Sequence, residues 1–486
     1  MRAIISPIWF LFLFQFMITV VPAQERLQGG MAEKEAHFAR SVSGLQSNSV
    51  TDIVIYRGKI WLGTGKGLAL SEDGGQSWTT ITHEDGLGRG SVSALAVNDT
   101  IIWVATAFDS LTKDAGELPT GGGLAYSLDG GRTWVHIEQP GPTPVQNVTF
   151  DIALHDDGSV WITSWGGGIQ RTFNLGKTWE VVPPDTFFFD PFGRLNHRGF
   201  SVISANGVLW VGTAGGINKS IDNGNTWTNF NHQNQSEPIS GNFVVAIGSQ
   251  TYQGIEYIWA ATINAEDPDE FRAVSISDDG GYSWRTTLEG VFAHNFAFDD
   301  SVAYVAADAG LFKSIDFGRT WAKFSIIEDK DSGTLYLSEE VFTAAVDEEH
   351  TLWVGGPDGL ARTADDGLSW QIYRGTREPG TEGEPRTFAY PSPFSPQRHN
   401  RLSGNGHIRF QYNTLSATRV TLRIYNFAME PVAVVVQDKE RPGPGVFFEV
   451  WNGRNSRGEV VANGVYFYSL KLDGDGIYWG KFIVMD

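Results

Sequence analysis

The chain has 486 residues, with 36 Lys and Arg against 56 Asp and Glu, and it contains no cysteine. An acidic chain repels nucleic acid and anionic lipid, and a chain without thiols can form neither a disulfide framework nor a thiolate metal site. Its 57 glycines, 17 tryptophans and 31 phenylalanines, with little amphipathic helix, predict an all-β protein rich in tight turns.

Residues 1–23 have the pattern of a secretory signal peptide. Arg2 is their only charge, a long apolar run follows, and Val21-Pro22-Ala23 places small residues where a signal peptidase cleaves. An uncleaved membrane anchor is the alternative. No later run is long and apolar enough to span a bilayer. We therefore expect a secreted or cell-surface protein of bacterial origin, without a membrane span after cleavage.

An eight-residue motif first occurs as SEDGGQSW at residues 71–78 and returns six times. All copies fit Ser/Thr-x-Asp/Asn-x-Gly-x-Ser/Thr-Trp. The third positions are Asp73, Asp129, Asn174, Asp222, Asp279, Asp316 and Asp365, and the final tryptophans are Trp78, Trp134, Trp179, Trp227, Trp284, Trp321 and Trp370. Recurrence at steps of 37–57 residues indicates a repeat architecture.

Each copy lies in a longer unit with four short runs rich in Val, Ile, Trp and Thr, such as SVSALAV, IIWVAT and GGLAYS before the second copy. Four antiparallel strands repeated around a ring form a propeller blade. Seven units predict a seven-bladed β-propeller over residues 36–374.

The motif itself is best interpreted as a structural turn. Its Asp or Asn can accept hydrogen bonds from backbone N–H groups two residues on, its Gly permits a backbone that other residues avoid, and its Trp can pack between sheets. The motif resembles the Asp-box (BNR) repeat of sialidases, xyloglucanases, sortilin-type receptors and a photosystem assembly factor. That resemblance implies a position on the outer rim, away from the functional face.

A second resemblance covers residues 44–68, GLQSNSVTDIVIYRGKIWLGTGKGL, which look like the propeller repeats of two-component sensor ectodomains. It supports the fold but says little about signalling. How the ring closes stays open at this point. Either residues 38–42 or residues 370–373 could form the outer strand of the last blade.

Residues 375–387 have linker composition, and residues 388–486 carry short strands with regular turns, which predicts an immunoglobulin-like β-sandwich. YPSPFSP, VTLRIYNFAMEPV and VWNGRNSRGEVVANGVYFYSLKL resemble the C-terminal Ig-like domain of the flagellar hook-capping protein and of secreted bacterial proteins. Similar domains are type IX secretion sorting signals, which implies the secretion machinery as a partner. The ending at Asp486 departs from the basic-apolar strand of such signals, so a plain structural Ig module is the alternative.

Three long connections are expected on the face that propellers use for ligands, namely residues 107–122, 184–199 and 263–273. Aromatic rings beside carboxylates suit a carbohydrate. Phe187–Phe189 could instead cover a blade junction, and His197 is better interpreted as a surface loop residue than as a ligand. The candidate ligand-binding residues are Asp109, Trp165, Asp190, Arg194, His197, Arg198, Asp267, Glu270 and Arg272.

Catalysis has weaker support. A glycosidase needs two carboxylates at a fixed separation, and nothing pairs two here, although Asp52 and Asp151 lie on or near inner strands. The Arg-Ile-Pro segment of sialidases is absent, as are phosphate loops and metal motifs, so we expect no cofactor and no metal. The leading hypothesis is a non-catalytic surface protein that binds a glycan or a protein. The alternatives are a carbohydrate-active hydrolase or lyase and an extracytoplasmic assembly factor.

Overall fold

The computed structural model describes residues 41–42, 44–112, 116–375, 379–380 and 383–486. The predicted signal peptide lies outside these residues. The chain divides into two compact units. One contains the described residues up to Tyr336 together with Glu340–Gly375, and the other contains Leu337–Glu339 and the described residues from position 379 to Asp486. Among the described residues there is no α-helix, only the short 3-10 turns η1 (His83–Asp85) and η2 (Leu195–His197).

The first unit is a succession of antiparallel sheets, each with four strands in chain order, and β1 (Ser41–Val42) adds a fifth strand to the first sheet. They are β2–β5 (Val50–Tyr56, Lys59–Thr64, Gly67–Ser71, Trp78–Ile81), β6–β9 (Ser91–Val97, Ile102–Thr112, Gly116–Ser127, Val135–Ile137), β10–β13 (Thr149–Leu154, Val160–Ser164, Gly168–Thr172, Glu180–Val181), β14–β17 (Gly199–Ala205, Val208–Thr213, Gly216–Ser220, Thr228–Phe230), β18–β21 (Phe243–Tyr252, Ile255–Ile263, Ala273–Ser277, Arg285–Thr287), β22–β25 (Ala293–Asp299, Val302–Ala307, Gly310–Ser314, Ala322–Lys323) and β28–β31 (Thr343–Val346, Leu352–Gly356, Gly359–Thr363, Gln371–Tyr373). A small pair, β26 (Glu328–Asp329) and β27 (Thr334–Leu335), precedes the last sheet.

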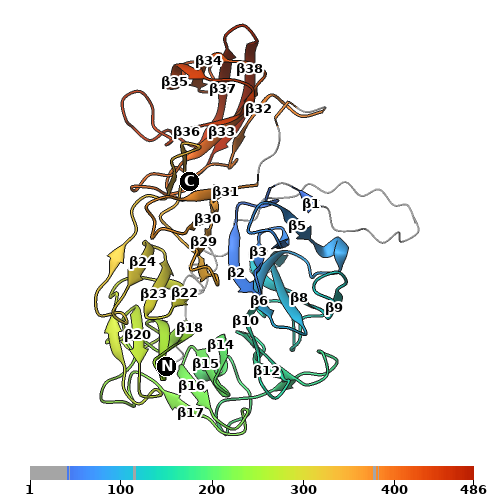
Figure 1. Ribbon diagram of the computed structural model, residues 1–486, viewed down its shortest axis with the longest axis vertical. Coiled ribbons are helices and arrows are strands. Elements are labelled where there is room, and N and C mark those ends of the chain that lie inside the picture. The colour runs from blue at the N-terminus through green and yellow to red at the C-terminus, as the bar shows by residue number, and fades with distance from the viewer. Residues whose placement is uncertain (1–40, 43, 113–115, 376–378, 381–382) are drawn as a thin grey trace, which may run out of the picture. The chain divides into compact units, whose positions relative to one another are not determined.

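The first strands of these sheets contact one another in a closed cycle. β2 packs on β6, β6 on β10, β10 on β14, β14 on β18, β18 on β22, β22 on β28, and β28 returns to β2. Figure 1 shows the sheets arranged around a central axis. This arrangement is that of a β-propeller.

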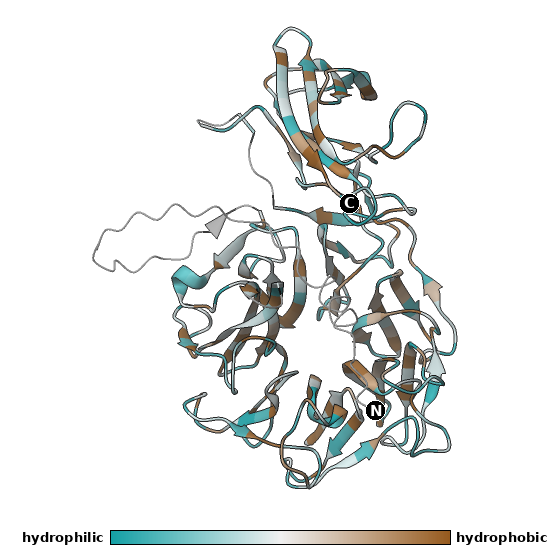
Figure 2. Cartoon of the chain, turned by 180° about the vertical axis from the view of Figure 1, so that it is seen from behind, coloured by the Kyte–Doolittle hydropathy of each residue, from teal (hydrophilic) through white to brown (hydrophobic). Residues whose placement is uncertain are grey.

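Buried aromatic rings fill the space between neighbouring sheets. The second strand of six sheets carries a fully buried tryptophan, namely Trp61, Trp103, Trp161, Trp210, Trp259 and Trp353, and the sixth sheet has Tyr304 in this place. In three junctions the motif tryptophan of the next sheet meets that ring edge to face, as Trp179 does on Trp103, Trp227 on Trp161 and Trp321 on Trp259. Figure 2 shows hydrophobic segments on the strands of the ring and hydrophilic colour on many turns.

The repeated motif forms one hydrogen-bonded turn between the third and fourth strands. In the first copy, Ser71 Oγ accepts from Gly75 N–H (2.8 Å) and donates to Asp73 Oδ1 (2.8 Å), which also accepts from Ser77 N–H (2.9 Å). The expected acceptor pattern was therefore wrong in detail, because the carboxylate bonds the N–H four residues on. In the third copy Asn174 does the same and donates to Thr178 Oγ1 (2.8 Å).

Two consecutive residues of the motif have left-handed backbone, yet only the second must be glycine. The first position tolerates Leu175, Asn223, Phe317 and Asp366 at φ of 58–59°. At the second, an added Cβ on Gly224 would lie 2.3 Å from the Trp161 ring of the preceding sheet, and one on Gly75 would lie 3.0 Å from Trp353. The invariant spacing of Gly and Trp thus follows from packing of one sheet on the next.

Cationic side chains on the third strands bridge neighbouring sheets. Arg171 donates to Asn223 O (2.7 Å) and Lys219 to Gly280 O (2.9 Å), each while lying over the tryptophan of its own sheet. The acceptor is in both cases the carbonyl at the fourth position of the next motif.

The last and first sheets join through the same kind of contact. Arg362 lies over Trp353 and donates to Gly74 O (2.9 Å). Asn48 accepts from Gly359 N–H (2.6 Å) and from Gly375 N–H (2.7 Å). β31 (Gln371–Tyr373) is the outer strand of the last sheet, whereas β1 (Ser41–Val42) pairs with β5 of the first. Of the two closure hypotheses, the structure therefore fits residues 370–373, and among the described residues no strand is shared across the junction.

The second unit has two antiparallel sheets. One contains β32 (Thr387–Tyr390), β33 (Ile408–Thr414) and β36 (Gly445–Trp451), and the other contains β34 (Thr418–Tyr425), β35 (Pro431–Arg441), β37 (Gly464–Leu472) and β38 (Gly476–Val484). Both contribute to one hydrophobic core, which includes Phe410, Leu422, Trp451, Tyr468 and Phe482.

Candidate functional site

The connections from second to third strands and from each sheet to the next emerge on one face of a propeller. On this face lie the turn 164–168 of the third sheet, the connection 182–198 and the connection 263–273. The segment 107–122 differs from expectation. β7 and β8 continue through it as a paired hairpin from Ala107↔Gly121 to Thr112↔Gly116, so most of it is strand rather than irregular loop.

His197 anchors the loop of residues 184–199, which we call the phenylalanine loop. Its side chain is only 1% exposed, so its interpretation as a surface residue was wrong. Nδ1 accepts from Asp190 N–H (2.9 Å), which leaves Nε2 to donate to Asp185 Oδ1 (3.0 Å). Phe189 stacks on the imidazole at 5.8 Å. His197 therefore has a structural role, because it joins the two ends of the loop, and Asp185 holds its ring in one tautomer.

Three other phenylalanines of this loop face solvent. Phe188 is 98% exposed, Phe192 75% and Phe187 53%. The three phenylalanines of Phe187–Phe189 therefore have different roles. Phe189 packs on His197, whereas Phe187 and Phe188 are exposed. Exposed aromatic rings on an ordered loop are unusual in a monomeric protein and commonly mark a binding surface.

Two arginines contact aromatic rings of this surface. Arg194 lies over Phe187 at 3.5 Å, and Arg198 lies over Trp165 at 5.4 Å. Arg198 also donates to the carbonyls of Pro191 (2.5 Å) and Phe192 (3.0 Å), and Phe192 meets Trp165 edge to face at 5.3 Å. Asp190 Oδ1 accepts from the N–H groups of Phe192 and Gly193, so this carboxylate shapes the loop.

In the connection 263–273 the carboxylates also hold backbone. Glu270 is buried and accepts from Asn242 N–H (3.2 Å), Asn242 Nδ2 (2.7 Å), Ala265 N–H (2.5 Å) and Gln233 Nε2 (3.2 Å). Asp267 accepts from Asp269 N–H and from Gln233, and these bonds lower the pKa of Asp267. Arg272 pairs with Asp308 at 3.8 Å.

The structure brings most of the predicted residues into neighbouring loops but leaves one apart. Burial lowers the pKa of Arg198, and the nearby charges of Glu266 and Asp190 oppose that effect, so the two connections approach each other there. Asp109 instead lies on the β7–β8 hairpin, where burial and the Glu117 carboxylate raise the pKa of Asp109.

Several residues that organise this surface were missed by sequence reasoning. Asp185, Phe192, Gln233 and Asn242 each hold or extend the loops just described. The partners in these contacts lie between 12 and 37 residues away in the chain, at no repeating interval. Only the aromatic content of the loop could have indicated Phe192.

Two carboxylates line the inner strands of the ring. Asp52 accepts from Ile53 N–H (2.9 Å) and bonds the backbone of Leu95 in the next sheet. Asp151 likewise accepts from Val202 N–H (2.8 Å) and Ser201 Oγ (3.1 Å) of its neighbour. Burial, and next the Asp151 charge, raise the pKa of Asp52 to about 7, and burial raises the pKa of Asp151 to about 6. Both therefore join sheets rather than form an open catalytic pair.

Among the described residues, no three His, Cys, Asp or Glu side chains converge in a way that could hold a metal ion. Within the same residues, no helix has the length and apolar character needed to cross a membrane.

No known family model matches the chain, and no curated protein is similar to it in sequence. Its fold is similar to that of the GH74 enzyme of Niastella koreensis, with a TM-score of 0.51, 13% identity, and coverage of 91% of this chain and 73% of that one. It is also similar to the extracellular domain of BT3049 of B. thetaiotaomicron, assigned as a hybrid two component system, with a TM-score of 0.50, 12% identity, and coverage of 91% and 55%.

A weaker structural match is PorZ, a surface component of the type-IX secretion system of Porphyromonas gingivalis, with a TM-score of 0.42, 13% identity, and coverage of 90% of this chain and 66% of PorZ. The chain thus spans about two thirds of PorZ and about half of the BT3049 domain. At these identities, the matches to the GH74 enzyme and to the BT3049 domain support the β-propeller fold alone.

Proposed function

We propose that this chain is a secreted or surface-exposed, seven-bladed Asp-box propeller that binds a protein or glycan partner through the phenylalanine loop. The observation that carries the proposal is Phe188, fully exposed beside Phe187 and Phe192 on a loop that His197 and Arg198 hold in place. A pre-ordered aromatic surface loses little conformational entropy on binding, which is typical of interface hot spots.

The carboxylates of the same face favour binding over hydrolysis. Glycoside hydrolysis needs one carboxylate as acid and a second as base or nucleophile. Glu270 is occupied by four hydrogen-bond donors, and Asp190 by the backbone of its own turn. These two carboxylates stabilise the loops and are not free to act as an acid and a base.

For the second unit we propose an immunoglobulin-like domain that directs export or surface attachment. Its support is the two-sheet arrangement with its own core, together with the YPSPFSP and GVYFYSLKL segments. A fluorescent fusion carrying residues 388–486, expressed in a type IX-competent host, should reach the cell surface. Retention in the periplasm would reject the sorting role.

Binding is tested on a glycan array and a panel of outer-surface proteins, with release of reducing sugar measured in parallel. Phe187, Phe188 and Phe192 changed together to Ser should abolish binding. The matched control changes Leu128, Ile221 and Ile315 to Ser, because these exposed side chains lie on the motif turns. Equal loss in both variants would contradict the proposal, and sugar release that a single carboxylate substitution abolishes would favour the hydrolase.

A further inference from the structure

A small cavity lies at the motif turns of the fifth and sixth sheets, away from the phenylalanine loop. Its lining includes Arg285 of β21, Arg319 of the sixth motif, Asp278 of the fifth motif and Tyr257 of β19. Its volume is about 70 Å³. Because a water-sized group needs roughly 10–15 Å³ of such space, the cavity accepts on the order of five non-hydrogen atoms.

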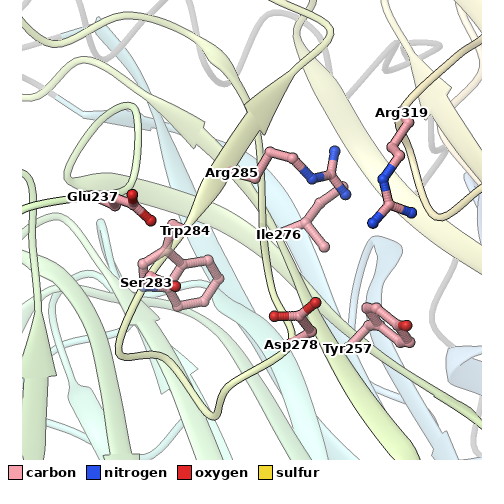
Figure 3. Close-up of a pocket in the computed structure, with 8 residues that line it drawn as sticks. All are labelled: Glu237, Tyr257, Ile276, Asp278, Ser283, Trp284, Arg285 and Arg319. Carbon is pink, nitrogen blue, oxygen red and sulfur yellow. The ribbon is translucent and has the colours of Figure 1, made fainter.

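The cationic side of the cavity is held in position by the sixth motif. Arg285 Nη1 donates to Gly318 O (3.0 Å) and Nη2 to Phe317 O (2.5 Å), and Tyr257 stacks on the Phe317 ring at 4.5 Å. Figure 3 shows the guanidinium groups of Arg285 and Arg319 near one another, with the Asp278 carboxylate and the Tyr257 ring below them in the view.

The charges of this cavity are separated rather than paired. Burial, and next the like charge of Arg319, lower the pKa of Arg285, whereas the charges of Asp278 and Asp316 raise it. An anion between the two guanidinium groups would further reduce their repulsion. Asp278 makes no hydrogen bond or ion pair with any described residue, although its charge acts on Arg285. The lining carries two cations, Arg285 and Arg319, and two carboxylates, Asp278 and Glu237, which suits a ligand with both charges better than a simple anion.

We propose that this cavity binds a small zwitterion of the α-amino acid type. Its carboxylate lies between Arg285 and Arg319, where planar guanidinium donors match two oxygens. Its ammonium group faces Asp278. The site is separate from the phenylalanine loop and does not depend on the function proposed for it.

The test is a ligand-observed NMR titration of the whole protein with glycine, and with acetate and methylammonium as its two halves. For a ligand of about five non-hydrogen atoms, we expect a Kd on the order of 1 mM for glycine and much weaker binding of either half. Arg319→Gln and Asp278→Asn should each weaken glycine binding at least about fivefold, in line with loss of one charged hydrogen bond.

Arg132→Gln is the matched control, because Arg132 has the position of Arg319 in the second motif and does not line the cavity. It should leave the affinity unchanged. Both Arg319 and Asp278 are exposed, so thermal melting should show that all three variants fold. Acetate binding as tightly as glycine, an equal loss in Arg132→Gln, or no glycine binding would each overturn the proposal.

Discussion

At the scale of single residues, the repeated Asp is exposed or half-buried, and its hydrogen bonds make it structural. The Ser77 hydroxyl and N–H, and then Ser71, lower the pKa of Asp73 to about 2, and the equivalent Thr133 bonds do the same for Asp129. Such a carboxylate stays ionised at neutral pH and is unsuited to proton transfer. Its regular recurrence reflects the turn, and the natural Asn174 shows that charge is not essential there.

Asp279 tests whether geometry or charge matters in the motif. Asp279→Asn should retain the turn, because the amide oxygen can accept from Ser283 N–H and the amide nitrogen can donate to Ser283 Oγ, as Asn174 does with Thr178. Asp279→Ala loses these partners and should lower Tm by several degrees more than Asp279→Asn. Thermal unfolding by circular dichroism measures both. Equal Tm losses would show that the charge is required.

Asp52 gives a prediction with a defined pH window. Its folded-state pKa of about 7 lies above the ordinary value, so between about pH 4 and 7 the folded chain holds the extra proton. The free energy of unfolding therefore falls as pH rises through this window. Asp52→Asn keeps an acceptor oxygen and should be more stable than the parent at pH 8 by about 1–2 kcal/mol, a figure reduced because Asp52 is only half-buried, and equal to it near pH 4.

Denaturant unfolding at the two pH values measures this difference. Asp156→Asn, on an exposed turn, is the control and should change stability equally at both. A stability gain at pH 4 as large as at pH 8 would mean that ionisation of Asp52 is not the cause.

At the scale of elements, the short strands could be predicted and the functional loops could not. The strands β33–β38 lie in the segment where the sequence predicts short strands with regular turns, because alternating apolar residues and Gly turns are local signals. The sequence predicts a loop at residues 107–122, because Asp, Gly and Pro disfavour strands. Pairing between β7 and β8 overrides this local preference and forms a hairpin. The structural role of His197 depends on hydrogen bonds between the two ends of one loop, and no periodicity in the sequence indicates these bonds.

His197 is a positioning residue for the phenylalanine loop, and this role can be measured without a partner. In His197→Ala, Asp190 N–H and Asp185 lose their acceptor and donor, at a cost of about 1–3 kcal/mol. Local opening should then rise about 5–100-fold, and chymotrypsin should cleave after Phe187 or Phe188 correspondingly faster. His350→Ala, at an exposed turn where His350 bonds Asp299, should leave that rate unchanged. An unchanged cleavage rate in His197→Ala would contradict the positioning role of His197.

At the scale of the whole propeller, the described residues close the ring by packing and hydrogen bonds rather than by a shared strand. The last sheet meets the first through β28 on β2, the Trp78–Tyr373 ring contact, Asn48 and the bond from Arg362 to Gly74. The junctions between successive sheets are also tied by the chain itself, whereas this one joins positions 288 residues apart. Loss of the cationic side chain that joins two sheets should therefore open this junction more than it opens a junction between successive sheets.

Arg362→Met and Arg171→Met compare the two kinds of junction. Each substitution removes a cation over a tryptophan and a hydrogen bond to the next motif, and should cost about 1–2 kcal/mol. Met keeps the apolar stem that packs on the ring. In Arg362→Met, the last sheet can separate from the first without breaking a covalent tether, so amide exchange should quicken selectively in β28–β31. In Arg171→Met those amides should exchange as in the parent. Uniform exchange in both variants would mean that the closing junction is no weaker than the others.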